Sequence, residues 1–98
     1  LTGDDLSAEE AHRIGLVNKV TSPARLHDEA VAMARRIADN APLAVRAIKE
    51  VVLRTSGIPL EDAYAIEDAG AAVVMRSSDA REGPRAFLEK RKPRFQGS

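Results

Sequence analysis

The 98 residues of the chain are enough for one small domain. The 15 basic and 15 acidic residues cancel to a formal net charge of zero, which argues against a nucleic-acid binder that works by bulk positive charge. The absence of cysteine excludes disulfides and thiol nucleophiles, and with only two histidines no metal site is expected. Seventeen alanines and three aromatic residues favour packed helices, and no apolar run is long enough to span a membrane.

The first twenty residues predict a short helix followed by one strand. Ser7-Ala8-Glu9-Glu10 has the form of a capping box, in which the Ser7 hydroxyl accepts from the Glu10 amide. Gly15 ends this helix, because a left-handed residue is favoured there. Residues 16–20, Leu-Val-Asn-Lys-Val, predict a short strand. A single strand cannot satisfy its own backbone groups, so we expect its partners to lie outside this chain.

Three helices follow, each with apolar residues at helical spacing. Ser22-Pro23 starts the first of them, with serine as the cap and proline at the first helical position. Asn40-Ala41-Pro42 ends that helix and starts the next, which Ser56-Gly57 closes. The third covers about residues 60–76.

A last helix is predicted to begin at Asp79 in a second capping-box pattern and to be closed by Pro93, with residues 94–98 as a tail. Pro84 falls at about its fifth position, where a proline removes a hydrogen bond, so we expect a bent or late-starting helix. The charge here is uneven. Residues 81–98 hold six basic and two acidic side chains, a local charge of +4, and residues 1–80 hold nine basic and thirteen acidic ones.

Candidates for chemistry are few when judged from the residues alone. The paired carboxylates of Asp4-Asp5 and Glu9-Glu10 lie at a helix start, where negative charge suits the cap and the helix dipole. Ser7 and His12 do not make a convincing nucleophile pair, because the Ser7 hydroxyl is needed for capping. No catalytic residue is therefore assigned.

Phe87 and Lys90 are the more interesting pair. Three residues apart, they share a face if both are helical, and a ring with an ammonium group can grip a nucleotide through its base and its phosphate. The alternative is that Phe87 anchors a core while the basic residues form a solvated helix end. Spacing alone favours this alternative.

The order of the segments resembles the C-terminal part of the crotonase superfamily, the enoyl-CoA hydratases and isomerases. The similar stretches are residues 1–3, 7–11, 13–20, 40–44 and 49–50, and above all Ser78-Asp79-Ala80-Arg81-Glu82-Gly83 leading into residues 85–93. The resemblance covers nearly the whole chain but less than half of a typical family member.

The resemblance implies a fold and a division of the chain. The expected fold is mainly α, as the helical C-terminal, trimer-forming part of an α/β crotonase-like (ClpP/crotonase) fold. Residues 1–21 would be the last strand-bearing unit of the core, and residues 22–98 the helical region that caps the site and forms oligomers. The apolar helix faces would then meet the core or a neighbouring subunit.

The resemblance also implies a function. The expected activity is that of a 2-enoyl-CoA hydratase, which adds water across the double bond of an acyl-CoA thioester. Backbone donors of the family's N-terminal part hold the thioester oxygen, and its glutamates supply acid and base. The acids Glu9, Glu10 and Glu82 match no catalytic position of the family. The chain alone is therefore expected to be inactive.

Two positions take a role from the resemblance. Phe87 and Lys90 match the family residues that approach the CoA nucleotide, often across a subunit boundary, which raises this interpretation to equal standing with the structural one. The expected partners are an acyl-CoA substrate and further copies of the chain in a trimer or hexamer, with no nucleic acid and no membrane. No cofactor is expected beyond the CoA of the substrate, and the expected location is the bacterial cytoplasm or another reducing compartment. Two alternatives stay open: a non-enzymatic helical oligomerisation module, and a CoA-binding module without turnover.

Overall fold

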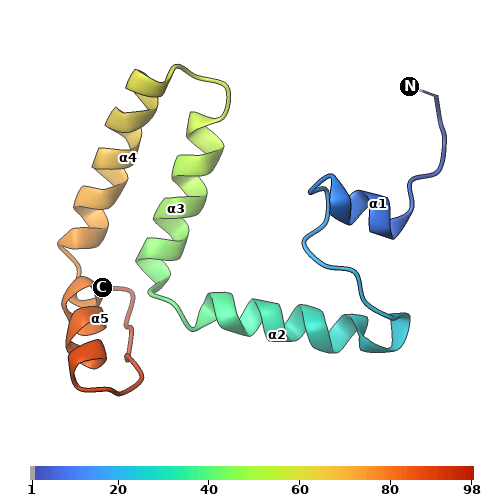
Figure 1. The fold of residues 1–98 in the computed structure, drawn as a ribbon. Helices are drawn as coiled ribbons and strands as arrows, with labels where there is room; N and C mark the ends of the chain where they lie inside the picture. Colours follow the sequence, from blue (N-terminus) through green and yellow to red (C-terminus); the bar gives the residue numbers. More distant parts are fainter. Residues whose placement is uncertain (1) are drawn as a thin grey trace. The chain divides into compact units, whose positions relative to one another are not determined.

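The computed structural model describes residues 2–98; Leu1, the first residue of the resemblance, lies outside the described residues. The described part is helical (Figure 1) and has no strand. Its elements are α1 (Ala8–Arg13), the 3₁₀ helix η1 (Pro23–Arg25), α2 (Leu26–Ala38), α3 (Pro42–Thr55), α4 (Leu60–Met75) and α5 (Ser78–Leu88). The chain divides into two compact units, one reaching to Met33 and the other running from Ala34 to Ser98. The predicted boundary after residue 21 stays a prediction.

The first unit begins with α1, whose predicted ends are confirmed. The Ser7 side chain accepts a hydrogen bond from the Glu10 amide at 3.1 Å. In a full capping box the Glu10 carboxylate would also accept from the Ser7 amide. This second bond is absent from the described contacts, because the Glu10 carboxylate instead accepts from Arg13 at 2.7 and 2.5 Å. Gly15 has a φ of +79°, which allows the chain to wrap back over the end of the helix.

The strand predicted at residues 16–20 is wrong for the described chain. The amides of Leu16 and Val17 both donate to the Ala11 carbonyl and so close the end of α1, and the Val17 carbonyl lies 3.2 Å from Nδ1 of His12. These backbone groups are not available for a ladder, and the part of the chain that the structure describes offers no partner strand. Lys19 instead forms an ion pair with Glu29 on α2 at 2.6 Å.

In the second unit, α3 and α4 lie side by side as a helical hairpin (Figure 1). Pro42 occupies the first position of α3, as predicted, and α4 ends at Met75, one residue before the expected end. The two helices approach closely at Gly70, where a Cβ atom would lie 3.1 Å from Cγ2 of Val51. Glycine at this position lets the helix backbones come together.

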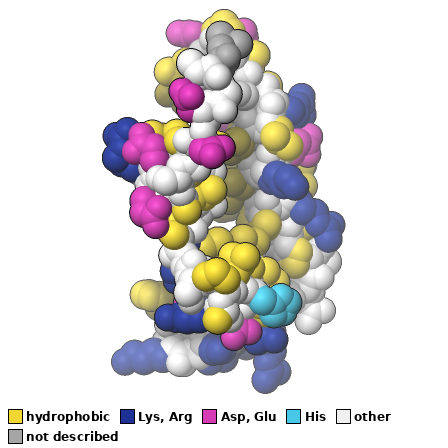
Figure 2. Space-filling view, turned by 90° about the vertical axis from the view of Figure 1, so that its right-hand side faces the viewer, with side chains coloured by type: hydrophobic (Ala, Val, Ile, Leu, Met, Phe, Trp, Pro, Cys, Tyr) yellow, Lys and Arg dark blue, Asp and Glu magenta, His cyan; other side chains and the backbone are white. Residues whose placement is uncertain are grey.

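The helices bury very little apolar surface. Among the described residues only two hydrophobic side chains are buried, Ala11 and Ala86. Large apolar residues on α2, α3 and α4 are exposed, and hydrophobic side chains are visible at the surface in Figure 2. On one side of the α3–α4 hairpin they line an apolar hollow of about 370 Å³, formed by Ala44, Ile48, Val52, Ala71, Val74 and Met75, among others. Polar and apolar residues lie on opposite faces of α2 and α3, as the sequence predicts, whereas the second half of α4 is apolar all round. The described residues provide almost no core for these apolar surfaces to cover.

In the part of the chain that the structure describes, every helix is too short or too polar to cross a bilayer.

Candidate functional site

The start of α5 differs from the prediction. Ser77, not Asp79, is the N-cap: its hydroxyl accepts from the Ala80 amide at 3.1 Å and lies 2.6 Å from the Val74 carbonyl. The N-cap therefore lies two residues earlier than expected. Asp79 falls in the first turn, where its acidic side chain still suits the positive end of the helix dipole.

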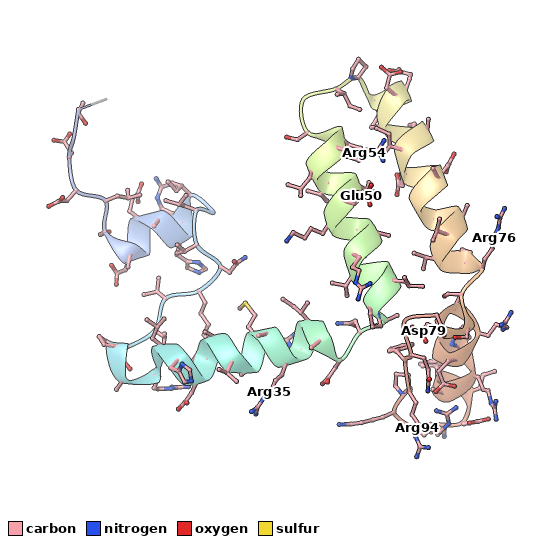
Figure 3. All side chains as sticks on the ribbon, turned by 180° about the vertical axis from the view of Figure 1, so that it is seen from behind. Arg35, Glu50, Arg54, Arg76, Asp79 and Arg94 are labelled. Carbon is pink, nitrogen blue, oxygen red and sulfur yellow. The ribbon has the colours of Figure 1, made fainter. Side chains whose placement is uncertain are left out.

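Asp79 does not cap the helix but binds the C-terminal end of the chain. It is only 3% exposed, and its carboxylate accepts from the backbone amides of Gln96 and Gly97 at 2.7 and 2.8 Å. Ser78 adds a second tie, because its amide and its hydroxyl both donate to the Ser98 carbonyl at 2.6 Å. Residues 91–98, here called the strap, thus run back along α5 (Figure 3).

The strap has an apolar contact as well. A Cβ atom on Gly83 would lie 3.8 Å from the ring of Phe95, so this aromatic residue packs over the glycine of α5. The segment predicted as a tail is thus attached to the last helix along its length.

Arg91 is the centre of a second group of ties. Its guanidinium donates to both carboxylate oxygens of Glu82, at 2.6 and 2.9 Å, and through Nε to Glu89 at 2.5 Å. Glu82 also accepts from the Arg94 amide at 2.8 Å. Glu89 is shared with Arg85, whose Nε lies 2.9 Å away. We call Arg91 with Glu82 and Glu89 the Arg91 clamp.

The clamp changes the acidity of its members. The hydrogen bonds from Arg91 and then from the Arg94 amide lower the pKa of Glu82 to about 2. The pKa of Glu89 is lowered as well, first by Arg85 and then by Arg91. The two carboxylates raise the pKa of Arg91. All three groups are therefore charged near neutral pH, and the clamp is a stable ionic unit there.

Pro84 lies inside α5 as its seventh residue, not its fifth, and the expectation of a late-starting helix is wrong. The missing proline N–H leaves the Ala80 carbonyl without its usual helical partner. The helix nevertheless continues to Leu88, four residues beyond the proline. It ends five residues before Pro93, so the predicted stop at that proline is also wrong.

Phe87 and Lys90 lie at the free end of α5. Phe87 is 83% exposed and Leu88 80%, so Phe87 anchors no core formed by residues 2–98. Lys90 lies beyond the helix with a φ of +52°, and its amide donates to the Phe87 carbonyl at 3.1 Å. The Arg91 amide donates to the Ala86 carbonyl at 3.0 Å and completes a Schellman turn. The shared helix face assumed from spacing is therefore wrong, and a tight turn joins the two residues instead.

A hollow of about 600 Å³ lies between α5 and the strap. Its lining combines arginine side chains with carboxylates that are already hydrogen-bonded: Ser78, Asp79, Arg81, Glu82, Arg85, Arg91, Arg94 and Gln96. Within the described range, Arg81, Lys90, Lys92 and Arg94 form no ion pair. The unpaired positive charge thus lies at Arg81 in the first half of α5, at Lys90 in the turn after the helix, and in the strap.

The other candidates from the sequence are used in local structure. Ser7 caps α1, and Glu10 pairs with Arg13, which lowers the Glu10 pKa. His12 lies against the Val17 carbonyl. Among residues 2–98 no three acidic or histidine side chains lie together in a way that would hold a metal ion.

Sequence reasoning missed Asp79, Glu82 and Arg91 as residues that hold the strap. Two acids three residues apart on one helix face, followed by a run of basic residues, were the available signal. The spacing of Asp79 and Glu82 at the helix start also fits a capping box, and this local interpretation was preferred to pairing with residues of the strap.

Comparison with known proteins shows the family of the chain. The family model described as enoyl-CoA hydratase/isomerase matches residues 1–98. A carnitinyl-CoA dehydratase of Escherichia coli is 45% identical over 101 residues, which cover 99% of this chain and 39% of that protein. The chain thus spans about two fifths of the curated relatives it matches.

Solved structures agree with this placement. An enoyl-CoA hydratase from Mycobacterium tuberculosis matches with a TM-score of 0.93 and 41% identity, over 99% of this chain and 38% of its own. An enoyl-CoA hydratase subunit from Geobacillus kaustophilus matches with a TM-score of 0.91 and 45% identity, over the same shares. The described residues are the helical part of the crotonase fold, and the chain belongs to the enoyl-CoA hydratase/isomerase family.

Proposed function

We propose that the protein to which this chain belongs adds water to, or removes it from, the α,β bond of an acyl-CoA thioester, most directly as a 2-enoyl-CoA hydratase. The observation behind this proposal is the family match over residues 1–98. Its relatives include proteins named as hydratases and as dehydratases of CoA thioesters. Hydration and dehydration are one reaction run in opposite directions, so one active site serves both.

The groups that perform this chemistry lie outside these 98 residues in our proposal. Hydration needs donors aimed at the thioester oxygen, where enolate charge develops, and an acid and a base near the double bond. Three of the acids are already paired: Glu10 pairs with Arg13, Asp79 holds two strap amides, and Glu82 holds Arg91. We therefore expect the isolated 98-residue chain to have no hydratase activity.

This chain supplies the nucleotide contact in the proposed enzyme. Phe87 presents an exposed ring, on which an adenine base can stack. Lys90 forms no ion pair among residues 2–98, so its ammonium group is available to a phosphate. The net positive charge of residues 81–98 favours an anionic ligand at this end.

The exposed helix faces support a second part of the proposal, which is assembly. Covering one large apolar side chain stabilises a fold by about 1.5–3 kcal/mol. Ile48, Val52 and Met75 are each more than 60% exposed. We propose that the rest of the protein and further copies cover these faces, in a trimer or hexamer. The reaction needs no cofactor beyond the CoA of the substrate.

The test is an assay of hydration, followed by the loss of ultraviolet absorbance of the enoyl thioester. The whole protein is expected to hydrate a short 2-enoyl-CoA, and the isolated chain is expected not to. Carnitinyl-CoA is tested in the dehydration direction, to find which substrate is used better. A whole protein that binds CoA and turns over neither substrate would support the CoA-binding module instead. One that binds no CoA but assembles would support the oligomerisation module.

A further inference from the structure

We propose that the Arg91 clamp is a positioning device for the nucleotide contact: by fixing the turn after α5, it holds Phe87 and Lys90 in the geometry that receives the CoA nucleotide. This inference rests on the proposed function, because it assumes that Phe87 and Lys90 meet the nucleotide. Arg91 and Glu82 touch no substrate in it and act only through the turn.

The first step of the argument is the strain in the turn. Lys90 is the one non-glycine residue with a positive φ among the described residues. For an L-residue this conformation is unfavourable, because the Cβ atom comes too close to the following carbonyl oxygen. The corresponding position after α1 is Gly15, which adopts it freely. A lysine in this place needs surrounding contacts that enforce the turn.

The second step is that the clamp encloses this residue. Glu89 precedes Lys90 and Arg91 follows it, and the two side chains are joined by the 2.5 Å contact between Nε of Arg91 and Glu89. Arg91 is in turn fixed to α5 by the two-pronged pair with Glu82. The Lys90 backbone is thereby held between two residues that are bound to each other and to the helix.

The third step concerns the geometry of the pair. A planar guanidinium that donates through two nitrogens to one carboxylate fixes orientation as well as distance, which a lysine ammonium cannot do. Arg91 also donates to the Lys92 carbonyl at 3.1 Å, so the chain after the turn is fixed too. A turn ordered before binding spares the ligand the cost of ordering it, and affinity rises accordingly.

The test uses Arg91→Lys in the whole protein, with Arg54→Lys as the matched control. Arg54 forms a single, more exposed ion pair with Glu50 on α3 (Figure 3), away from the clamp. Two substrates are compared: a 2-enoyl-CoA, and the same enoyl group on pantetheine, which lacks the nucleotide. Hydrogen exchange is followed at the amides of Lys90 and Arg91.

For Arg91→Lys we expect the KM for the enoyl-CoA to rise about tenfold, because the turn must now be ordered on binding. The kcat should stay within about twofold, and kcat/KM for the pantetheine substrate should not change, since no nucleotide is involved. The two amides should exchange faster. Arg54→Lys should alter none of these quantities.

Four results would overturn the inference, and they are distinguishable. Unchanged amide exchange in Arg91→Lys would mean that the clamp does not hold the turn. An equal loss of turnover for both substrates would mean a purely structural role. A raised KM in Lys90→Ala without one in Arg91→Lys would remove the positioning role and leave the proposed nucleotide contact intact. If neither variant raises the KM, the nucleotide contact itself fails, and the inference fails with it.

Discussion

The α3–α4 hairpin and the α5–strap region lie in the same compact unit, yet different interactions hold them. The hairpin is held by apolar contact, as at Gly70 and Val51, and leaves large hydrophobic side chains exposed. The strap is held to α5 by carboxylates that accept backbone amides and by the Arg91 clamp. The polar region satisfies its own hydrogen bonds, whereas the apolar one requires cover from elsewhere. In our proposal, the hairpin is the part that other segments and copies cover, and the α5–strap region is the part that presents the ligand contact.

The largest expected effect concerns the buried carboxylate of the strap. Asp79→Ala removes the acceptor of the Gln96 and Gly97 amides and should weaken the attachment of the strap by about 3 kcal/mol. Hydrogen exchange at these two amides should accelerate about a hundredfold. Asp28→Ala, on the exposed surface of α2, is the control. Unchanged exchange at residues 96 and 97 would show that Asp79 does not hold the strap.

A second variant tests the apolar half of the comparison. Gly70→Leu places a side chain where a Cβ atom alone would already lie 3.1 Å from Val51, and should destabilise the hairpin by about 2 kcal/mol. Thermal unfolding followed by circular dichroism measures the change. The matched control is Ala72→Leu, two residues along α4 at an exposed position. Equal melting temperatures for the two variants would mean that α3 and α4 do not pack at Gly70.

A third test uses two variants to separate the effect of the backbone conformation of the turn from the effect of the Lys90 side chain. Lys90→Gly and Lys90→Ala both remove the ammonium group, but only glycine adopts the positive φ without strain. Lys90→Gly should therefore be the more stable variant by about 1 kcal/mol. Denaturant unfolding of both variants gives the difference. A stability for Lys90→Ala equal to or above that of Lys90→Gly would contradict the strained turn.

The smallest expected effect is a dependence on acid. Glu82 has its pKa lowered to about 2 by Arg91 and the Arg94 amide, from a value of 4.5. A carboxyl with a lower pKa in the folded state stabilises that state above pH 4.5, and this contribution is lost as the pH falls from 4.5 toward 2. Amides of the strap should lose protection over that range, whereas the apolar packing of α3 against α4 should not respond to it.

The Glu82 titration itself provides the check. Followed by carbon NMR of the side-chain carboxyl, its midpoint should lie near 2 in the wild type. In Arg91→Met it should move toward 4.5, because the largest cause of the shift is removed. A midpoint that does not respond to this substitution would mean that the clamp does not form in solution.

Local rules predicted much of this fold. Ser7, Gly15 and Pro42 mark helix ends through interactions within one turn, and all three act as expected. The apolar spacing predicted the helices for a similar reason, because the helical repeat is a local property. Family resemblance added the context that no single motif supplied.

The predictions from sequence are wrong where two residues suit the same local role, or where a segment distant in the sequence determines the structure. Ser77 and Asp79 both suit an N-cap, and the carboxylate is drawn instead to amides seventeen and eighteen residues away. Residues 16–20 have strand character, but their first amides close α1. The strap could not be predicted from local patterns, because its ties to α5 join residues far apart in the sequence.

The measurement that tests the account most directly is the hydration of a 2-enoyl-CoA by the whole protein, in the wild type and in Lys90→Ala. We expect turnover in both, with the KM raised about tenfold in the variant through the loss of one phosphate contact and with kcat within about twofold. An active enzyme whose KM for the enoyl-CoA does not respond to Lys90→Ala would contradict the role given to this chain. A whole protein without turnover of any acyl-CoA thioester would contradict the proposed function.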